Sequence, residues 1–191
     1  MGLQYGSVIK LNPDHGCLEG TGSLVFDHKN RIAYVCLSER AEKKQLDIFI
    51  KKLNATVDKP YKVHSFNAKD ENGTKMYHTN VMMAILEKHV IFCTAFVDKK
   101  QKAALVKSFK DGGRELLDIT PDEVNEMCAN TIMLQGTNGK FVAVMSERAR
   151  KGFSKDKMAK LEKHYTIVAS PIPTIENIGG GSARCLCAEI Y

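Results

Sequence analysis

The sequence predicts an α/β protein assembled from a repeated unit of two strands, one helix and a third strand. Residues 37–41 (LSERA) and 145–149 (MSERA) are nearly identical and lie 108 residues apart, which indicates an internal repeat. Around both segments, short apolar stretches typical of strands alternate with longer amphipathic helix patterns. The chain is therefore interpreted as three ββαβ units in succession.

The first unit begins with a hairpin, because residues 23–26 and 31–37 are strand-like and a turn separates them. A helix comes next, with apolar residues at positions i, i+3, i+4 and i+7, namely Leu46, Phe49, Ile50 and Leu53. Asn54 ends this helix, and residues 61–66 form the third strand.

The second unit repeats this order, with a hairpin predicted from residues 81–86 and 90–95. Asp98 is expected to cap a helix that runs to Phe109, and the Gly112-Gly113 pair stops it. Residues 115–119 then return as an extended strand.

The third unit is preceded by a short helix, since residues 120–123 (TPDE) form a capping box with proline in the first turn. Its hairpin is predicted at residues 131–134 and 141–145 around an Asn-Gly turn, followed by a helix capped by Ser154. Strand 166–170 closes the unit, and the terminal residues 186–191 are expected to open a fourth. No linker-like segment interrupts the chain, which predicts a single domain over residues 1–191.

Composition places the chain among soluble globular proteins. It has 191 residues, of which 43% are hydrophobic and 26% charged, and it contains no apolar run near the roughly 20 residues of a membrane span. The N-terminus lacks a signal-peptide pattern, so the six cysteines are expected to be free thiols in a reducing, cytoplasmic compartment. Cys36 and Cys93 lie in apolar strand patterns and are expected to be buried.

The net charge of +6 is best explained by solvated helix faces. The lysines concerned are Lys43, Lys44, Lys51, Lys52, Lys99, Lys100 and Lys102. Nucleic-acid binding is not expected, because the chain has no tryptophan and its arginines are few and scattered.

The candidate functional residues precede the first strand of each unit. Glu19, His78, Asn130 and Cys185 occupy these equivalent positions, and units arranged around a common axis bring equivalent positions together. A carboxylate, an imidazole and a thiol in one place form a nucleophile, base and orienting-group set.

The glycine-rich residues 179–182 (GGGS) lie just before Cys185, separated from it by two residues. In such a loop the backbone can approach a ligand closely. Phosphate binding is disfavoured, because residues 186–191 alternate like a strand and do not open a helix. His15-x-Cys17 and Cys185-x-Cys187 lack the spacing of a zinc knuckle, so neither a metal nor any other cofactor is expected.

These motifs resemble one known group of enzymes over nearly the whole chain from Cys17 onward. The motifs are CLEGTGS at residues 17–23, YHTNVMM at 77–83, PTIE at 173–176 and the loop 179–185. They look like the guanidine-modifying (pentein) superfamily, in its amidinotransferase and arginine deiminase-related branch. The resemblance implies a five-bladed α/β propeller of ββαβ units, of which about three units and one strand are present.

The resemblance also implies roles for individual residues. Cys185 looks like the nucleophile that forms a covalent thiouronium intermediate, His78 like the acid/base, and Glu19 like the carboxylate that orients the histidine. Asn80 stands where arginine deiminases carry an aspartate, in the substrate-binding position. Arg184 is a candidate for binding a substrate carboxylate, with an ordinary surface arginine as the alternative.

Length is the main departure from the superfamily, whose members carry roughly a hundred further residues before this point. An open ring is expected to self-associate or to need the missing N-terminal segment, because uncovered strand edges and apolar faces favour association. Two functions are then open: a guanidino hydrolase or amidinotransferase acting on arginine-like substrates, or a truncated, non-catalytic binding or assembly module.

Overall fold

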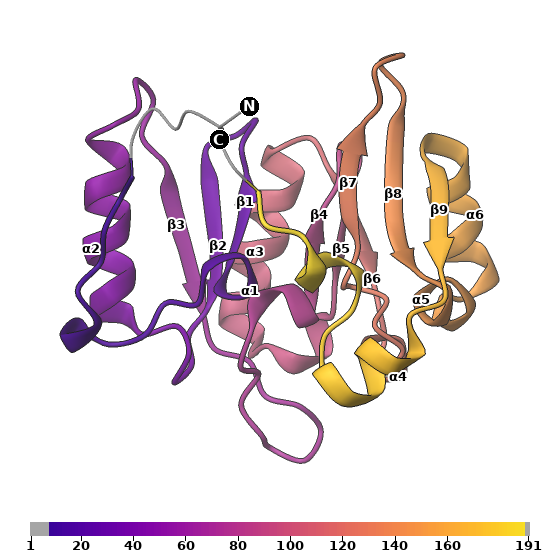
Figure 1. The fold of residues 1–191 in the computed structure, drawn as a ribbon, viewed down its shortest axis with the longest axis horizontal. Helices are drawn as coiled ribbons and strands as arrows, with labels where there is room; N and C mark the ends of the chain where they lie inside the picture. Colours follow the sequence, from indigo (N-terminus) through magenta and orange to yellow (C-terminus); the bar gives the residue numbers. More distant parts are fainter. Residues whose placement is uncertain (1–7, 190–191) are drawn as a thin grey trace.

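The structure, a computed structural model, describes residues 8–189. It contains three small sheets side by side, each with three strands, and helices lie between and outside them (Figure 1). In every sheet the first two strands form an antiparallel hairpin and the third strand pairs parallel to the second. The predicted α/β class and the threefold ββαβ order are confirmed.

The first unit consists of β1 (Leu24–Asp27), β2 (Ile32–Cys36), α2 (Lys43–Asn54) and β3 (Lys62–Phe66). Successive strand residues point to opposite faces of the sheet, so each face packs on a different helix. Leu24 and Val35 pack in the cluster with Leu46 of α2. Tyr34, on the other face, bonds Ser108 of the next unit at 2.8 Å.

The second unit consists of β4 (Met83–Ile85), β5 (His89–Phe92), α3 (Lys99–Asp111) and β6 (Glu115–Asp118). Asp98 caps α3 by accepting a hydrogen bond from the backbone N–H of Gln101 at 2.9 Å, as predicted. The hairpin is shorter than predicted, since residues Thr94–Phe96 turn into a 3-10 helix. There the N–H and hydroxyl of Thr94 both donate to Asp118, and this local bonding replaces further strand pairing.

The third unit consists of β7 (Ile132–Gln135), β8 (Phe141–Ser146), α5 (Glu147–Gly152), α6 (Lys155–His164) and β9 (Thr166–Ser170). Its helical part is divided because Ser146 caps α5 directly after the strand. The predicted capping box is present in α4 (Pro121–Asn125), where Thr120 and Glu123 bond each other's backbone. Ser154 lies at the start of α6 but makes no side-chain capping bond there.

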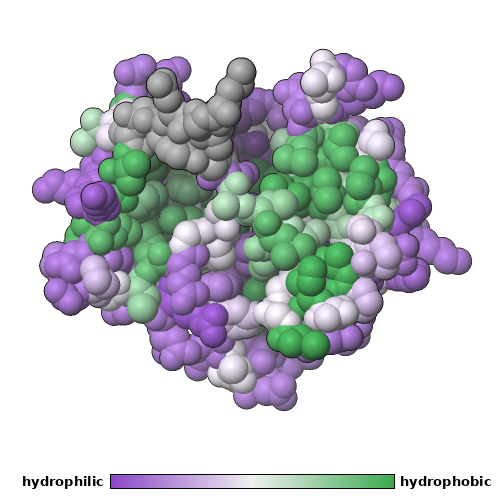
Figure 2. Space-filling model, in the orientation of Figure 1, coloured by the Kyte–Doolittle hydropathy of each residue, from purple (hydrophilic) through white to green (hydrophobic). Residues whose placement is uncertain are grey.

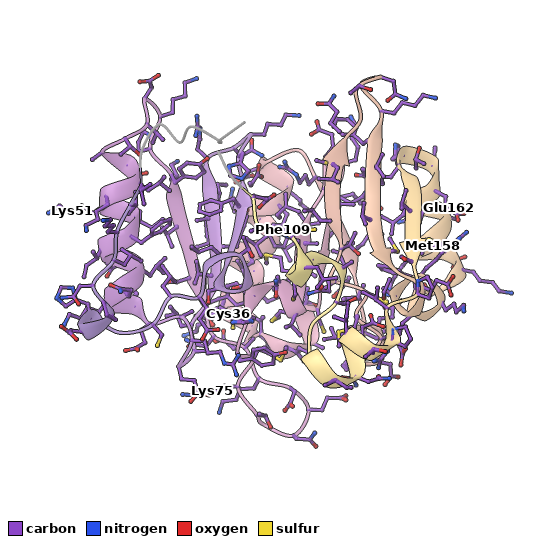
Figure 3. All side chains as sticks on the ribbon, viewed as in Figure 1. Cys36, Lys51, Lys75, Phe109, Met158 and Glu162 are labelled. Atoms are coloured by element: carbon purple, nitrogen blue, oxygen red, sulfur yellow. The ribbon has the colours of Figure 1, made fainter. Side chains whose placement is uncertain are left out.

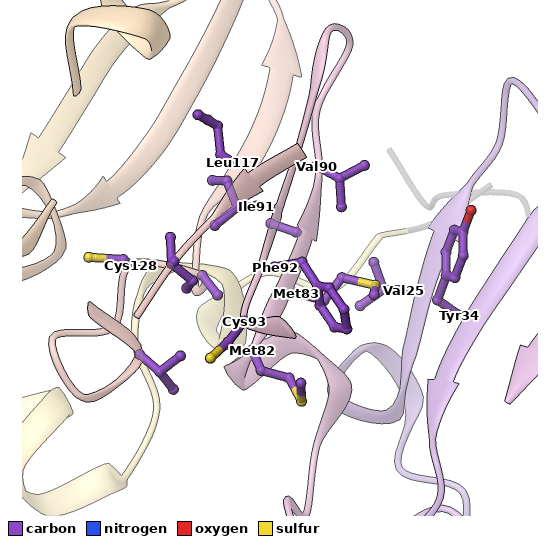
Figure 4. Packing of buried hydrophobic residues seen from close by; sticks show 14 of the residues in the cluster. Val25, Tyr34, Met82, Met83, Val90, Ile91, Phe92, Cys93, Leu117 and Cys128 are labelled. Carbon is purple, nitrogen blue, oxygen red and sulfur yellow. The ribbon is translucent and has the colours of Figure 1, made fainter. Parts of the chain in front are cut away.

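One hydrophobic cluster contains buried residues from all three units, among them Tyr34, Phe92 and Leu161. Figure 4 shows its middle part, where Met82, Met83 and Phe92 lie between the first two sheets. Figure 3 shows Phe109 directed into this interior and Lys51 directed outward from α2. The predicted lysine faces are confirmed, since all seven lysines are exposed except the half-buried Lys102.

The expected opening strand of a fourth unit is not formed within the described residues. Ala183–Leu186 is a 3-10 helix, and residues 187–189 are not part of any strand. Ile190 and Tyr191 lie outside the described residues. The alternating pattern alone does not make a strand, because a strand needs a hydrogen-bonded neighbour.

The outer face of the third sheet carries apolar side chains, which Figure 2 shows over β7 and β8. Leu134 is 49% exposed and Val168 is 46% exposed there. This agrees with the expected uncovered apolar surface, while self-association itself stays a prediction. Among residues 8–189, no helix combines the length and the apolar character that crossing a bilayer requires.

Candidate functional site

Two short helices place the residues that precede the first two units. Glu19 lies before α1 (Gly20–Ser23), and His78 lies before the 3-10 helix η2 (Thr79–Val81). Thr79 joins the two helices, because its hydroxyl donates to the carbonyl of Ser23 at 2.5 Å and accepts from the N–H of Cys36 at 2.7 Å. Residues almost 60 positions apart in the chain therefore meet at one point.

Glu19 and His78 form the first half of the site. The Nε2 atom of His78 lies 2.7 Å from Oε2 of Glu19. On its other side the imidazole packs on Gly22, where an added Cβ would lie only 2.7 Å from Nδ1. Glycine is required at this position because any larger residue would displace the ring.

Arg40 supports the same carboxylate. Its guanidinium lies 3.7 Å from Oε2 of Glu19 and stacks over the ring of Tyr77, 5.0 Å from the centroid. The backbone N–H of Glu19 also donates to the carbonyl of Arg40 at 3.1 Å. One carboxylate oxygen is thus shared between an imidazole and a guanidinium.

Cys185 forms the second half of the site, on the 3-10 helix Ala183–Leu186 in the yellow segment of Figure 1. Its sulfur accepts hydrogen bonds from Nδ2 of Asn130 at 3.0 Å and from Nδ2 of Asn80 at 3.5 Å. The residue is exposed, so an approaching reagent can reach it. Solvent access and N–H donors at the sulfur are features that favour the reactivity of a thiol.

Glu176 fixes the loop that precedes Cys185. This carboxylate is 6% exposed and accepts the hydroxyl of Ser182 at 2.6 Å, while the carbonyl of Ser182 accepts the N–H of Cys185 at 3.0 Å. Gly180 has a φ of 68°, which glycine tolerates without strain. A Cβ on Gly181 would lie 2.9 Å from the Cβ of Cys185.

The two halves adjoin through the residues on either side of His78. The hydroxyl of Tyr77 donates to the carbonyl of Gly180 at 3.4 Å, and Asn80 reaches the sulfur of Cys185. Burial raises the pKa of Tyr77, and the nearby Cys185 raises it further. The loop that bears His78 is therefore in contact with the loop that bears the thiol.

Arg184 is turned away from this thiol. Its guanidinium donates to the carbonyl of Cys187 at 3.0 Å and to Glu189 at 2.6 Å. Arg184 and Glu189 line a cavity of about 340 Å³ together with residues of β1, β4 and β7. A substrate carboxylate would have to compete with Glu189 for this arginine.

The other cysteines differ from Cys185. Cys36, Cys93 and Cys128 are buried, as predicted for the first two. Burial raises the pKa of Cys36 and that of Cys93 to about 11 each, and it also raises the pKa of Cys128. Across the described part of the chain, no three His, Cys, Asp or Glu side chains are grouped as metal ligands.

Asn130 is the residue to which the sequence assigns no role. The repeat identifies it only as the counterpart of Glu19 and His78 before the third unit, whereas the structure places it against Cys185. The repeat itself carries the signal, because equivalent positions of successive units meet here. Tyr77 and Glu176 lie in the quoted motifs 77–83 and 173–176, but the motifs do not predict their contacts, which depend on how two loops pack.

Comparisons with solved structures agree with this architecture. Apo ArgZ, an arginine dihydrolase from the ornithine–ammonia cycle in Cyanobacteria, matches with a TM-score of 0.75 and 16% identity over 97% of this chain and 26% of its own. The N-terminal domain of an ArgZ variant covalently bound to a reaction intermediate matches with a TM-score of 0.72 and 20% identity. That match covers 97% of this chain and 60% of the domain.

A third structure, the ternary complex of AgrE with ornithine and NAD+, matches with a TM-score of 0.71 and 17% identity. It covers 97% of this chain and 25% of AgrE. The chain thus spans between 25% and 60% of the length of these structural relatives. None of the curated proteins matches the chain.

The solved structures share the repeated ββαβ architecture, and a family match over nearly the whole chain supports the guanidine-modifying pentein superfamily that the motifs resemble. Residues 3–191 match the family model described as N,N dimethylarginine dimethylhydrolase, eukaryotic. The chain belongs to that family.

Proposed function

We propose that this chain carries the reactive centre of a cysteine-dependent hydrolase that acts on the guanidino group of an arginine-like substrate. The observation that carries the proposal is the meeting of two sets of side chains from separate units. Glu19 binds His78, and the adjoining loop holds the exposed Cys185 between Asn80 and Asn130. The family match supports the same chemistry, since its description names a dimethylarginine hydrolase.

In the proposed first step the thiolate of Cys185 adds to the guanidinium carbon. The bond from that carbon to the departing amine then breaks, and the amine takes a proton from His78. The product is a thiouronium joined to the sulfur. This step needs a charged sulfur, because a guanidinium carbon is resonance-stabilised and a neutral thiol is a weak nucleophile.

In the proposed second step water attacks the thiouronium carbon and gives a proton to His78. The carbon–sulfur bond breaks, the remaining hydroxyl proton passes to solvent, and the ureido product and the thiolate are released. Glu19 holds the imidazole in place through both steps, as its 2.7 Å contact with Nε2 allows. A substrate amine in place of water would instead make the reaction an amidino transfer.

The test combines turnover with selective labelling. The purified chain is incubated with arginine or dimethylarginine, and ureido product is measured with and without glycine as an acceptor amine. Cys185→Ser is expected to abolish the product, because a hydroxyl is a far poorer nucleophile at neutral pH. Cys187→Ser is the matched control and is expected to retain the wild-type rate.

A brief reaction with a haloacetamidine, followed by peptide mapping, measures the thiol itself. Cys185 is expected to be modified first, and arginine is expected to protect it. Equal labelling of the exposed Cys17 and Cys185, together with no turnover, would contradict the proposal and favour a non-catalytic binding module.

A further inference from the structure

The side chain of Asn130 makes contact with Cys185 through both of its polar atoms. Its Oδ1 accepts the backbone N–H of Arg184 at 2.9 Å and that of Cys185 at 3.2 Å. Its Nδ2 donates to the sulfur of Cys185 at 3.0 Å and to the carbonyl of Asn80 at 3.3 Å. Asn130 is only 1% exposed, so these contacts are shielded from solvent.

This set of bonds fixes which way the amide points. A backbone N–H can only donate, so the atom facing Arg184 and Cys185 must be the oxygen. The carbonyl of Asn80 can only accept, so the atom facing it must be the amino group. The amino group therefore faces the sulfur, and the sulfur has to act as the acceptor.

An accepting sulfur favours the thiolate over the thiol. A neutral thiol is a weak acceptor, whereas hydrogen bonds in which one partner is ionised are about twice as strong. Among the neighbouring charged and titratable groups, His78 is bound by Glu19. Tyr77 is a phenol turned to Gly180, and the guanidinium of Arg184 is engaged by Cys187 and Glu189.

We infer that Asn130 is a further catalytic residue that stabilises the attacking sulfur of Cys185 by donating a hydrogen bond to it and fixes the direction from which it attacks. A catalytic role for Asn130 rests on the proposed function, whereas the effect of Asn130 on the thiol of Cys185 does not. Asn80 contributes less, because its Nδ2 lies 3.5 Å from the sulfur and its Oδ1 has no hydrogen-bond partner to fix the amide.

Asn130→Asp tests this inference with the smallest change in shape. A carboxylate still accepts the two backbone N–H groups, but it places a second negative oxygen where the amino group met the sulfur. The rate of Cys185 alkylation by iodoacetamide is measured from pH 5 to 10 by peptide mapping. We expect the midpoint of the pH–rate profile to move to higher pH by about one unit or more, which is about tenfold in rate below the midpoint.

Asn138→Asp is the matched control, since Asn138 lies in the exposed β7–β8 turn and its oxygen accepts the N–H of Lys140 at 3.0 Å. Its profile is expected to coincide with that of the wild type. Asn80→Asp is expected to give a smaller shift than Asn130→Asp. An unshifted profile in folded Asn130→Asp would overturn the inference.

A measurement on the wild type covers the case in which Asn130→Asp fails to fold. The side-chain amide signals of Asn130 in ¹⁵N NMR spectra are expected to shift with the same midpoint as the alkylation profile and to change when Cys185 is alkylated. Signals that stay constant would refute the contact. Neither measurement needs substrate, so a protein without turnover contradicts the proposed function while leaving this inference to be decided separately.

Discussion

The buried ion pair between Arg114 and Asp27 joins the first two units, and its removal has a calculable cost. The two side chains are 5% and 3% exposed. Arg114 also donates through Nε to the carbonyl of Leu86 at 2.8 Å. Asp27 accepts the backbone N–H of Asn30 at 3.1 Å and its Nδ2 at 2.8 Å, so two donors remain when the arginine is removed.

Arg114→Met keeps an unbranched stem but leaves the carboxylate of Asp27 buried without its counter-charge. Breaking such a pair from one side costs about 3–5 kcal/mol, because the remaining charge is no longer solvated or compensated. The expected loss is a large share of the roughly 5–15 kcal/mol that stabilises a natural protein. At about 2–4 °C per kcal/mol for a chain of this size, the melting temperature is expected to fall by about 6–20 °C.

Urea unfolding followed by circular dichroism measures the difference. We propose that residues 1–191 form one domain, because one hydrophobic cluster joins all three units, and a single transition is therefore expected. Lys107→Met is the control. It breaks the ion pair between Lys107 and Asp111, whose side chains are 74% and 63% exposed respectively. The expected loss of unfolding free energy is about 0.2–0.5 kcal/mol.

The double variant Asp27→Asn/Arg114→Met separates the charge effect from lost packing. Because it removes both charges, it is expected to be more stable than the sum of the two single losses predicts. A loss below about 1 kcal/mol for Arg114→Met, or strict additivity in the double variant, would refute the reasoning.

Two further predictions concern the histidines. Gly22→Ala is expected to lower ureido production about 100-fold, because the His78 ring must retreat by about 0.7 Å, the difference between 2.7 Å and the 3.4 Å of ordinary contact. Gly179→Ala is the control: the nearest atom to its added Cβ is 3.8 Å away, so the wild-type rate is expected. A fully active Gly22→Ala would contradict the close packing of Gly22 on His78. Burial lowers the pKa of His89, while Glu115 opposes this shift and His164 and Lys160 add to it. Its stabilising contribution is therefore present above the unfolded value of about 6.5 and is lost as the pH falls. His89→Gln should then lose less stability than the wild type between pH 7.5 and 5.5 in urea unfolding, and equal losses would rule out this titration.

Sequence patterns predicted the ββαβ units because the information for them is local. Apolar periodicity marks helix faces such as that of Leu46, and capping residues such as Asp98 and Thr120 mark helix starts. Both act within one or two turns of chain. The repeat then indicated which distant positions are equivalent, and the contact of Glu19 with His78 agrees with that expectation.

The sequence by itself therefore determined the class of fold, the order of its elements and the loops from which the candidate site is built. Tertiary structure alone decided that Asn130 holds Cys185, that Arg184 is engaged by Glu189, and that Ala183–Leu186 form a 3-10 helix in place of the start of a strand. The physical reason is that a hydrogen bond depends on distances within a few tenths of an ångström. Such distances are set by the packing of all units together, and no periodicity in the chain encodes them.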